Sequence, residues 1–341
     1  MHRPLRLTCS KDALAANWRW LASKSGVPCG AAVKADGYGL GARDVVGVLL
    51  EAGCGDFFVS SWWEAEQLAG ISQGADLAVL HGFGPDDLPA LELAARPVLN
   101  STEQVARWKE VAPQRPCDVM IDTGMNRLGL REAEAGVLDG LRIHTLHTHL
   151  ACADEDHPLN SLQLERFRAA AASIPAERYS LANTAGILLG SEYAFDLTRP
   201  GLGLYGGVTG ESARVHIQQV AHLEAQIVQR RTIRSGESCG YSATYVAPSD
   251  IQAAVLNIGY ADGYWRGFSA RGSARCGDAL LPVLGRVSMD LVITDCSAAP
   301  DLKEGDWVAI DFSLEEAATV SGKSQYELLT GLGRRFERSW L

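Results

Sequence analysis

The stretch Ala31-Ala32-Val33-Lys34-Ala35-Asp36-Gly37-Tyr38-Gly39-Leu40-Gly41 joins an apolar run to a glycine-rich loop through a single lysine. The run predicts a buried strand, and the glycines predict an abrupt turn after it. Burying an ammonium group without a partner is costly, whereas a lysine whose pKa is lowered by burial is a good nucleophile toward an aldehyde. The alternative is a lysine that reaches solvent at a strand end. The stretch therefore marks Lys34 as a candidate for imine chemistry.

The composition favours a large protein that binds small molecules. Its 341 residues are sufficient for two domains. The net charge of -10 argues against a nucleic-acid surface, which needs clustered Lys and Arg. The eight cysteines include no Cys-x-x-Cys pair, as is typical of reduced thiols. Because the N-terminus lacks a signal-peptide core and no run is long enough to span a membrane, we expect a cytoplasmic protein.

Short apolar runs alternate with amphipathic stretches over the first two hundred residues. This alternation predicts an α/β fold, a (β/α)8 barrel of the TIM type, although a doubly wound sheet would give similar local signals. The eight candidate strands are Cys29 to Lys34, Phe57 to Ser61, Leu77 to Gly82, Pro97 to Asn100, Asp118 to Thr123, Arg142 to Leu150, Tyr179 to Asn183 and Phe195 to Arg199.

The pattern changes after residue 218. Residues 223–228 alternate with period two, and further short strands are separated by Gly, Pro and Asp turns. We therefore expect a barrel domain over residues 1–218 and a mainly β C-terminal domain over residues 219–341.

Polar residues end several of the predicted barrel strands. In a barrel these strand ends converge on one site. Each residue alone has an ordinary explanation, since Asp-Thr-Gly and Arg-Pro-Gly are common turns, but the ordered set points to a shared site. The set comprises Lys34, Arg127 in Asp122-Thr123-Gly124-Met125-Asn126-Arg127, His149, Asn183-Thr184 and Arg199-Pro200-Gly201.

The motif around Lys34 closely resembles the cofactor-lysine motif of the alanine racemase family. The strand-end set follows that family's order over most of the chain, and the C-terminal motifs Gly259-Tyr260-Ala261-Asp262-Gly263 and Gly285-Arg286-Val287-Ser288-Met289-Asp290 are also similar to it. The resemblance implies a pyridoxal 5'-phosphate-dependent isomerase that interconverts L-alanine and D-alanine and supplies D-alanine for peptidoglycan. It implies that Lys34 holds the cofactor and moves a proton on one face of the substrate.

Racemisation removes a proton from one face of the α-carbon and returns one to the other, so a second acid/base is expected. The resemblance assigns this role to Tyr260. A tyrosine titrates near pH ~10 when unperturbed, so the role needs cationic neighbours, which His149 and Arg199 could provide. The ordinary alternative is an aromatic strand before an Asp-Gly turn.

The resemblance also implies the remaining contacts. Arg127 and the backbone amide of Met289 would bind the substrate carboxylate. Family members are head-to-tail homodimers, so Tyr260 and Met289 would act in the active site of the partner subunit. The implied cofactor-binding residues, besides Lys34, are Tyr38, His149, Asn183, Thr184, Arg199, Gly201 and Leu202.

Arg199, which the resemblance places at the cofactor's ring nitrogen, constrains the chemistry. A guanidinium only donates hydrogen bonds, so it can bind only an unprotonated ring nitrogen. The ring is then a weaker electron sink than one paired with a carboxylate, which suits racemisation and suppresses transamination.

The segment His144-Thr145-Leu146-His147-Thr148-His149 also invites a metal interpretation. On a regular strand His147 and His149 would share one face while His144 would point to the other, and no Cys or carboxylate cluster completes a site. We therefore expect no metal site. The resemblance instead places His149 near the cofactor ring.

The chain departs from the family pattern at two positions. Met120 stands where many members carry a carbamylated lysine that orients the substrate-binding arginine, so we expect a bound chloride or a nearby polar group to position Arg127. Trp340 stands where the family has a tyrosine that contacts the phosphate, so we expect altered cofactor retention or substrate range.

Three alternatives remain open. A racemase of broader range could act on serine and other small amino acids, because side-chain pockets discriminate by small increments. Amino-acid decarboxylases share the two-domain design, but they pair the ring nitrogen with a carboxylate rather than with an arginine such as Arg199. Non-catalytic pyridoxal-phosphate carriers have a similar barrel but lack the β domain that contains Tyr260 and Met289.

Overall fold

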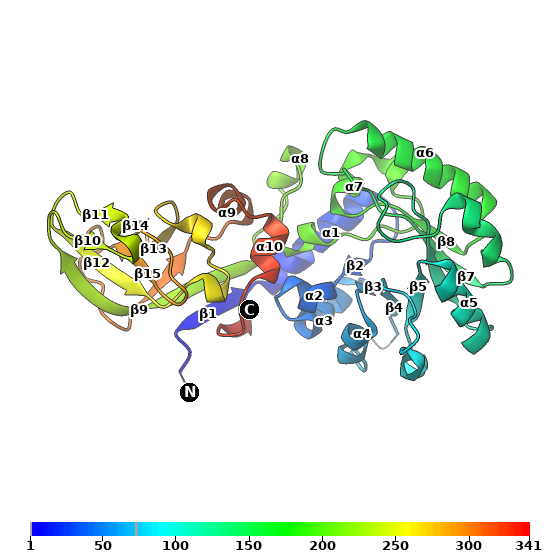
Figure 1. Cartoon of the computed structure of the whole chain (residues 1–341), viewed down its shortest axis with the longest axis horizontal. Coiled ribbons are helices and arrows are strands. Elements are labelled where there is room, and N and C mark those ends of the chain that lie inside the picture. Colours follow the sequence, from blue (N-terminus) through cyan, green and yellow to red (C-terminus); the bar gives the residue numbers. More distant parts are fainter. Residues whose placement is uncertain (1, 72–73) are drawn as a thin grey trace. The chain divides into compact units, whose positions relative to one another are not determined.

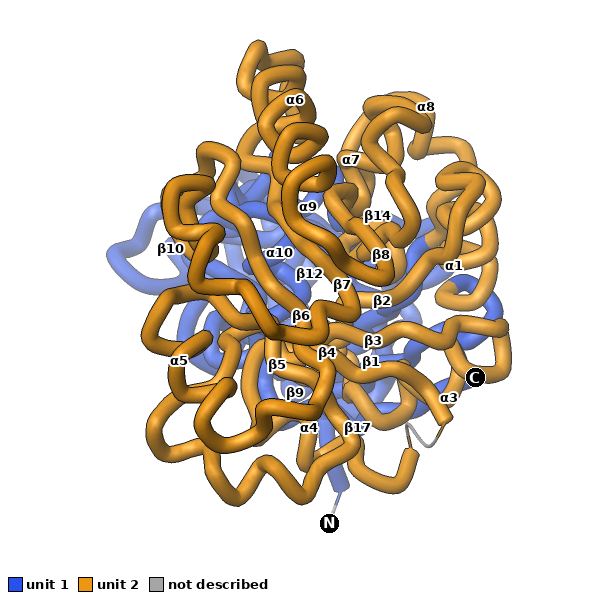
Figure 2. Tube along the Cα trace, turned by 90° about the vertical axis from the view of Figure 1, so that its right-hand side faces the viewer, with its two compact units in different colours: residues 1–13, 219–341 blue, residues 14–218 orange. Residues whose placement is uncertain are grey.

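The computed structural model describes residues 2–71 and 74–341. The chain divides into two compact units (Figure 2). Unit 2 comprises Leu14–Gln218, and unit 1 comprises the residues up to Ala13 together with Gln219–Leu341. The sequence analysis placed residues 1–13 with the barrel, whereas β1 (Leu5–Cys9) pairs with two strands of unit 1.

Unit 2 contains a curled parallel sheet with its strands in sequential order, surrounded by helices (Figure 1). The strands are β2 (Ala31–Ala32), β3 (Asp56–Val59), β4 (Asp76–Val79), β5 (Arg96–Leu99), β6 (Cys117–Met120), β7 (Ile143–His147) and β8 (Arg178–Ser180). The α-helices are α1 (Lys11–Ser25), which begins in unit 1, α2 (Lys34–Tyr38), α3 (Ala42–Ala52), α4 (Trp62–Gln67), α5 (Thr102–Val111), α6 (Pro158–Ser173), α7 (Thr184–Leu189) and α8 (Glu211–Arg214). Short 3-10 helices are η1 (Leu88–Glu92), η2 (Glu132–Leu138), η3 (Ser191–Tyr193) and η4 (Leu202–Tyr205).

The eighth predicted strand closes the barrel without forming a full ladder. Thr198 bridges Cys29, the amide of Ala32 donates to the carbonyl of Pro200, and the amide of Arg199 donates to Ala182 on the other side. Pro200 has no N–H to donate, which limits the pairing of this segment. The barrel prediction is confirmed, with seven strands and one bridging segment.

Unit 1 is built on an antiparallel sheet. The long strand β9 (Ala221–Ile233) pairs with β1, β12 and β16, which closes six strands into a ring. β1 and β17 extend the sheet, and their pairing is parallel. The other strands are β10 (Ser238–Cys239), β11 (Tyr245–Val246), β12 (Ile251–Leu256), β13 (Ser273–Cys276), β14 (Ala279–Leu284), β15 (Val292–Asp295), β16 (Trp307–Ile310) and β17 (Glu337–Trp340). Its helices are η5 (Tyr241–Ala243), η6 (Tyr260–Asp262), η7 (Arg266–Phe268), α9 (Leu314–Ser321) and α10 (Gln325–Thr330).

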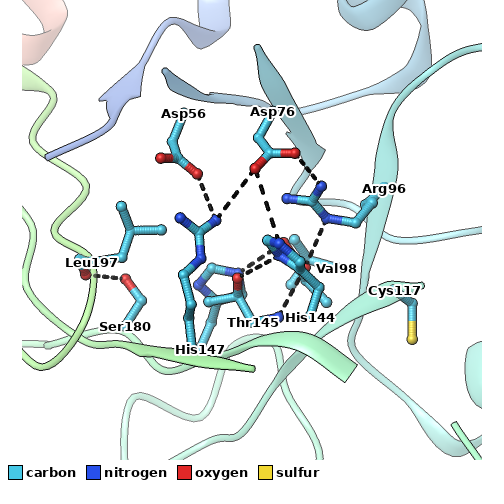
Figure 3. A network of polar contacts seen from close by, with 12 residues as sticks. Asp56, Asp76, Arg96, Val98, Cys117, His144, Thr145, His147, Ser180 and Leu197 are labelled. Carbon is cyan, nitrogen blue, oxygen red and sulfur yellow. Dashed lines mark hydrogen bonds and ion pairs between the residues drawn. The ribbon is translucent and has the colours of Figure 1, made fainter. Parts of the chain in front are cut away.

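The barrel interior is layered, because residues two apart on a strand point to the same side. An apolar cluster fills the middle of the barrel and comprises Phe58, Ala78, Val98, Met120 and Leu197. Charged side chains at the start of β3, β4, β5, β6 and β8 form a layer next to it (Figure 3). In that layer Arg96 bonds Asp76 at 2.5 Å and Asp118 at 3.2 Å, and Arg178 bonds Asp56 at 2.6 Å.

Asp118 is the buried centre of this charged layer. Its carboxylate accepts from the amide of Thr145 and lies 3.1 Å from Nε2 of His147 and 3.6 Å from Nδ1 of His144. These hydrogen bonds outweigh desolvation and hold the pKa of Asp118 well below its usual range. Burial, with Arg199 nearby, lowers the pKa of His147, so its imidazole is neutral.

The prediction that His144 faces away from His147 is wrong, because both contact Asp118. The register between β6 and β7 shifts: Cys117 pairs with Ile143 while Val119 pairs with Leu146. The extra residue is a bulge, which breaks the alternation of faces.

We expect the free energy of unfolding to fall as pH is lowered from 7 to 5. The unfolded imidazole of His147 binds a proton near pH ~6.5, whereas the folded one does so only at lower pH. The unfolded state therefore binds more protons in this range, and stability decreases by up to about 1.4 kcal/mol per pH unit for this residue. Asp118 stays ionised throughout.

Urea unfolding at several pH values measures this slope. A His147→Gln variant carries no titrating group at this position and should show a shallower slope. Equal slopes for the two proteins would contradict the assignment.

Candidate active site

Lys34 lies directly after β2, at the end of the barrel opposite to the charged layer. The amide of Val33 donates to Phe58 on β3 at 2.9 Å, which fixes the chain just before the lysine. Burial lowers the pKa of the Lys34 amine, Arg127 lowers it further, and Glu64 opposes both. A lowered pKa increases the share of neutral amine at a given pH, and the neutral amine is the form that attacks an aldehyde.

The segment after Lys34 is one turn of left-handed helix. Ala35, Asp36 and Gly37 have φ/ψ of 53/47°, 54/50° and 61/45°, and Tyr38 has φ 56°. L-residues pay roughly 1–2 kcal/mol each for this conformation, which they otherwise adopt singly. Surrounding contacts must therefore hold the turn.

Three contacts hold this turn. Oδ1 of Asp36 accepts from the amide of Ala42 at 2.8 Å, which caps the start of α3. The amide of Ala35 donates to Oε1 of Glu64 at 2.7 Å. The ring of Tyr38 stacks on Tyr205 with centroids 4.5 Å apart, and the hydroxyl of Tyr205 donates to Ala32 at 2.8 Å.

Thr184 and the glycines of η4 form a close-packed cradle. Oγ1 of Thr184 accepts from the amides of Gly201 at 3.0 Å and Gly203 at 3.2 Å. A Cβ atom on Gly201 would lie 2.2 Å from Oη of Tyr38. Only glycine thus lets these hydroxyl and amide groups converge, as binding an anion such as a phosphate requires. Leu202 begins η4 and is buried.

Asn183 lies beside this cradle as the N-cap of α7. Oδ1 of Asn183 accepts a hydrogen bond from the amide of Gly186 at 2.8 Å. This contact caps the N-terminus of the helix that begins at Thr184.

Arg199 is buried, and among the residues that the structure describes no carboxylate is in hydrogen-bond contact with it. NH1 donates to Oγ of Ser180, and NH2 donates to the carbonyl of Thr148 at 2.7 Å. Ser180 in turn donates to the carbonyl of Leu197 at 2.5 Å. Burial lowers the pKa of Arg199 to about 10, and the charge of Asp118 partly opposes this effect. The guanidinium remains a cation with donors to spare.

His149 is an imidazole whose pKa is affected by three cationic side chains. Burial, Arg199, Arg127 and Lys34 together lower its pKa to about 3. These influences place His149 among the three cations and keep its imidazole neutral.

Arg127 lies on the loop after β6 and is exposed. Oδ1 of Asp122 shapes this loop by accepting from the amides of Gly124, Met125 and Asn126. Within residues 2–71 and 74–341, the Arg127 guanidinium makes no hydrogen bond or ion pair. Met120 packs into the apolar cluster of the barrel interior, so it does not take over the orienting function. The expected chloride stays a prediction.

Tyr260 and Met289 belong to unit 1 and lie next to each other there. The amide of Tyr260 donates to Ser288 at 3.1 Å, and the amide of Ala261 donates to Met289 at 3.0 Å. A Cβ atom on Gly259 would lie 2.3 Å from the Met289 carbonyl, so glycine permits this approach. The guanidinium of Arg266 lies 5.5 Å from the centroid of the Tyr260 ring.

Trp340 is the last residue of β17 and pairs with Cys9 on β1. Its indole Nε1 is buried and has no hydrogen-bond partner within the described part of the chain. Its predicted effect on cofactor retention remains a prediction.

The sequence analysis missed four supporting residues: Glu64, Ser180, Gly203 and Tyr205. For Glu64 a signal existed, because Ser61-x-x-Glu64 is a capping-box pattern. Gly203 and Tyr205 follow the Arg199-Pro200-Gly201 motif within four residues but were not singled out. Ser180 carries no local signal, since its contact with Arg199 depends on barrel closure.

The parts of the chain that the structure describes contain neither a membrane-spanning helix nor a cluster of metal ligands. None of the helices there is long and apolar enough to cross a bilayer. Nor do three or more His, Cys, Asp or Glu side chains gather there as a metal site would require.

Together, the buried lysine, the anion cradle and the buried arginine define a barrel site for a phosphorylated aldehyde. Two family sequence models fit the chain: "Alanine racemase, N-terminal domain" matches residues 9–209, and "Alanine racemase, C-terminal domain" matches residues 220–340. The chain belongs to the alanine racemase family.

Individual alanine racemases align with this chain over nearly its full length. Alanine racemase of Rhodospirillum rubrum is 42% identical over 98% of this chain and 95% of its own. The relative named "Alanine racemase, catabolic" from Agrobacterium fabrum is 41% identical over 98% and 92%. The crystal structure of alanine racemase from Bartonella henselae with covalently bound pyridoxal phosphate has a TM-score of 0.91 and 33% identity over 100% of both chains. The biosynthetic alanine racemase of Pseudomonas aeruginosa has a TM-score of 0.90 and 31% identity, also over 100% of both.

We expect Asp36→Ala to lower the stability of the barrel by about 0.5–2 kcal/mol, because it removes the cap on α3. Asp36→Asn keeps an acceptor oxygen and tolerates the left-handed conformation, so its effect should be much smaller. Thermal unfolding of the full chain compares the two variants. Equal losses would show that the hydrogen bond to Ala42 does not stabilise the turn.

Proposed function

We propose that the chain interconverts L-alanine and D-alanine with pyridoxal 5'-phosphate as its cofactor. The observation that carries this proposal is the half-buried Lys34 amine. Burial and Arg127 lower its pKa, and among the described residues no carboxylate forms an ion pair with it. Such a group attacks an aldehyde, and such a site needs anions to balance its charge. Membership of the alanine racemase family supports the same conclusion.

The residues present fit this cofactor. Lys34 would bind its aldehyde carbon, Tyr38, Thr184 and the backbone of Gly201 and Leu202 would hold its phosphate, and Arg199 would donate to its ring nitrogen. His149 and Asn183 would border it. When bound, the cofactor withdraws electrons from the amino acid attached to it and so acidifies the α-carbon hydrogen.

The chain's own residues would then move the proton. Nζ of Lys34 would exchange it on one face, and the hydroxyl of Tyr260 on the other. Arg127 would bind the substrate carboxylate, assisted by the Met289 amide. That amide has no acceptor within the described residues.

Arg199 also argues for racemisation over other reactions. Its partners Ser180 and Thr148 hold the guanidinium by two N–H groups. Because a guanidinium cannot act as the acid partner of a ring nitrogen, electron withdrawal by the ring stays moderate. That favours the return of the proton over longer-lived side reactions.

We further propose a homodimer, in which Tyr260 of the partner subunit completes the site around Lys34. The location of Lys34 in unit 2 and of Tyr260 in unit 1 supports this arrangement. The product D-alanine would serve peptidoglycan synthesis, and the protein would act in the cytoplasm.

Full-length protein incubated with pyridoxal phosphate and L-alanine should form D-alanine, detected by chiral chromatography. Tyr260→Phe should reduce kcat by about 100- to 10,000-fold, because it removes one proton-transfer group. L-Serine run in parallel tests for a broader substrate range. A protein that binds the cofactor but forms no D-amino acid would instead be a carrier.

Mixing subunits tests the shared site. Lys34→Ala and Tyr260→Phe homodimers should each be nearly inactive. Random re-pairing makes about half of the dimers hybrid, and each hybrid has one intact site, so about one quarter of wild-type activity should return. No recovery after verified exchange would place both residues in the same subunit's site.

A further inference from the structure

We propose that Glu64 is a positioning residue for Lys34, fixing the peptide that follows the lysine against the start of α4. This inference rests on the proposed function, because it concerns how Lys34 is presented to the cofactor. Glu64 is half-buried and lies on α4, which follows the neighbouring strand β3.

The two carboxylate oxygens of Glu64 have separate tasks. Oε2 accepts from the amides of Ser60 at 2.6 Å and Ser61 at 3.4 Å, while the amide of Glu64 donates to Oγ of Ser61 at 3.4 Å. This is an ordinary capping box, and it needs only Oε2. Oε1 is left to accept from the amide of Ala35 at 2.7 Å.

The Ala35 amide needs an outside acceptor. It lies in the first turn of the left-handed segment, where a helix offers its own N–H groups no partner. Ala35 itself and Asp36 after it have positive φ angles, a left-handed backbone conformation that L-residues disfavour. A bond at this amide therefore fixes where the turn begins, one residue after the reactive lysine.

The residue before Lys34 and the peptide after it are thus tied to the same element pair. The Val33 amide binds the carbonyl of Phe58 on β3, and the Ala35 amide binds Glu64 on α4. The lysine main chain is held on both sides, which leaves only the side chain free to move.

Glu64 also acts on the amine by its charge. Burial and Arg127 favour the neutral amine, and Glu64 is the acid that favours the ammonium. A capping carboxylate far from Lys34, such as Glu327, would have no such influence, so the titration of Lys34 reports specifically on Glu64.

The experiment measures imine formation between Lys34 and pyridoxal phosphate as a function of pH, in full-length protein freed of cofactor. Nζ attacks the aldehyde carbon with loss of water, and borohydride then reduces the C=N bond so that mass spectrometry can quantify the modified peptide. The proteins compared are wild type, Glu64→Gln and Glu64→Asp. Glu327→Gln is the matched control, because Ser324 and Glu327 form the same capping box on α10.

We expect the pH midpoint of modification in Glu64→Gln to shift to lower pH, because the opposing charge is lost. Release of bound cofactor should become several-fold faster. Glu64→Asp, which keeps the charge with a shorter reach, should recover the midpoint but not the release rate. Glu327→Gln should match the wild type in both.

Unchanged midpoint and release in Glu64→Gln would overturn the proposal, as would equal changes in Glu327→Gln. If Glu64→Gln does not fold, an unchanged release rate in Glu64→Asp would overturn it. A wild-type protein that forms no imine at Lys34 would overturn the proposed function itself, and this inference with it.

Discussion

The site depends on one electrostatic constraint: several cationic side chains lie at the Lys34 end of the barrel, and no carboxylate in the described part of the chain is paired with them. Arg127 lowers the pKa of Lys34, and Arg199, Arg127 and Lys34 all lower the pKa of His149. No acidic side chain of the described residues forms an ion pair with any of these three cations. Such a cluster is unfavourable when empty, since burial and mutual repulsion both oppose the charged forms. It becomes favourable when a phosphate and a carboxylate enter. The binding of anionic ligands is therefore built into the barrel's electrostatics.

The opposite end of the barrel carries the compensating charge. Asp118 stays ionised because Arg96, His144 and His147 surround it, and its charge reaches Arg199 through the interior. The apolar cluster around Phe58 and Met120 separates the two layers. This separation keeps Asp118 from pairing with Arg199, so the guanidinium retains N–H groups for a ligand.

The sequence was sufficient to predict the barrel and the residues at its strand ends, because both follow from local patterns of apolar runs and turns. The left-handed turn could not be predicted, since Ala35 and Tyr38 do not favour positive φ; contacts with Glu64 and Tyr205 impose it. The bulge in β7 was also hidden, because nothing in His144-Thr145-Leu146 marks an extra residue. The place of β1 was missed for a similar reason: its partners lie more than two hundred residues away.

That pairing of β1 has a consequence for the order in which the chain acquires structure. Arg6 to Cys9 pair in parallel with Glu337 to Trp340, and the amide of Leu341 donates to Cys9. During synthesis the barrel segment can collapse as soon as it emerges, whereas the first strand must wait for the final one. The β unit is thus discontinuous, with the barrel inserted between its two parts. A chain cut before Glu337 would keep β9 but lose β17 as a neighbour of its first strand.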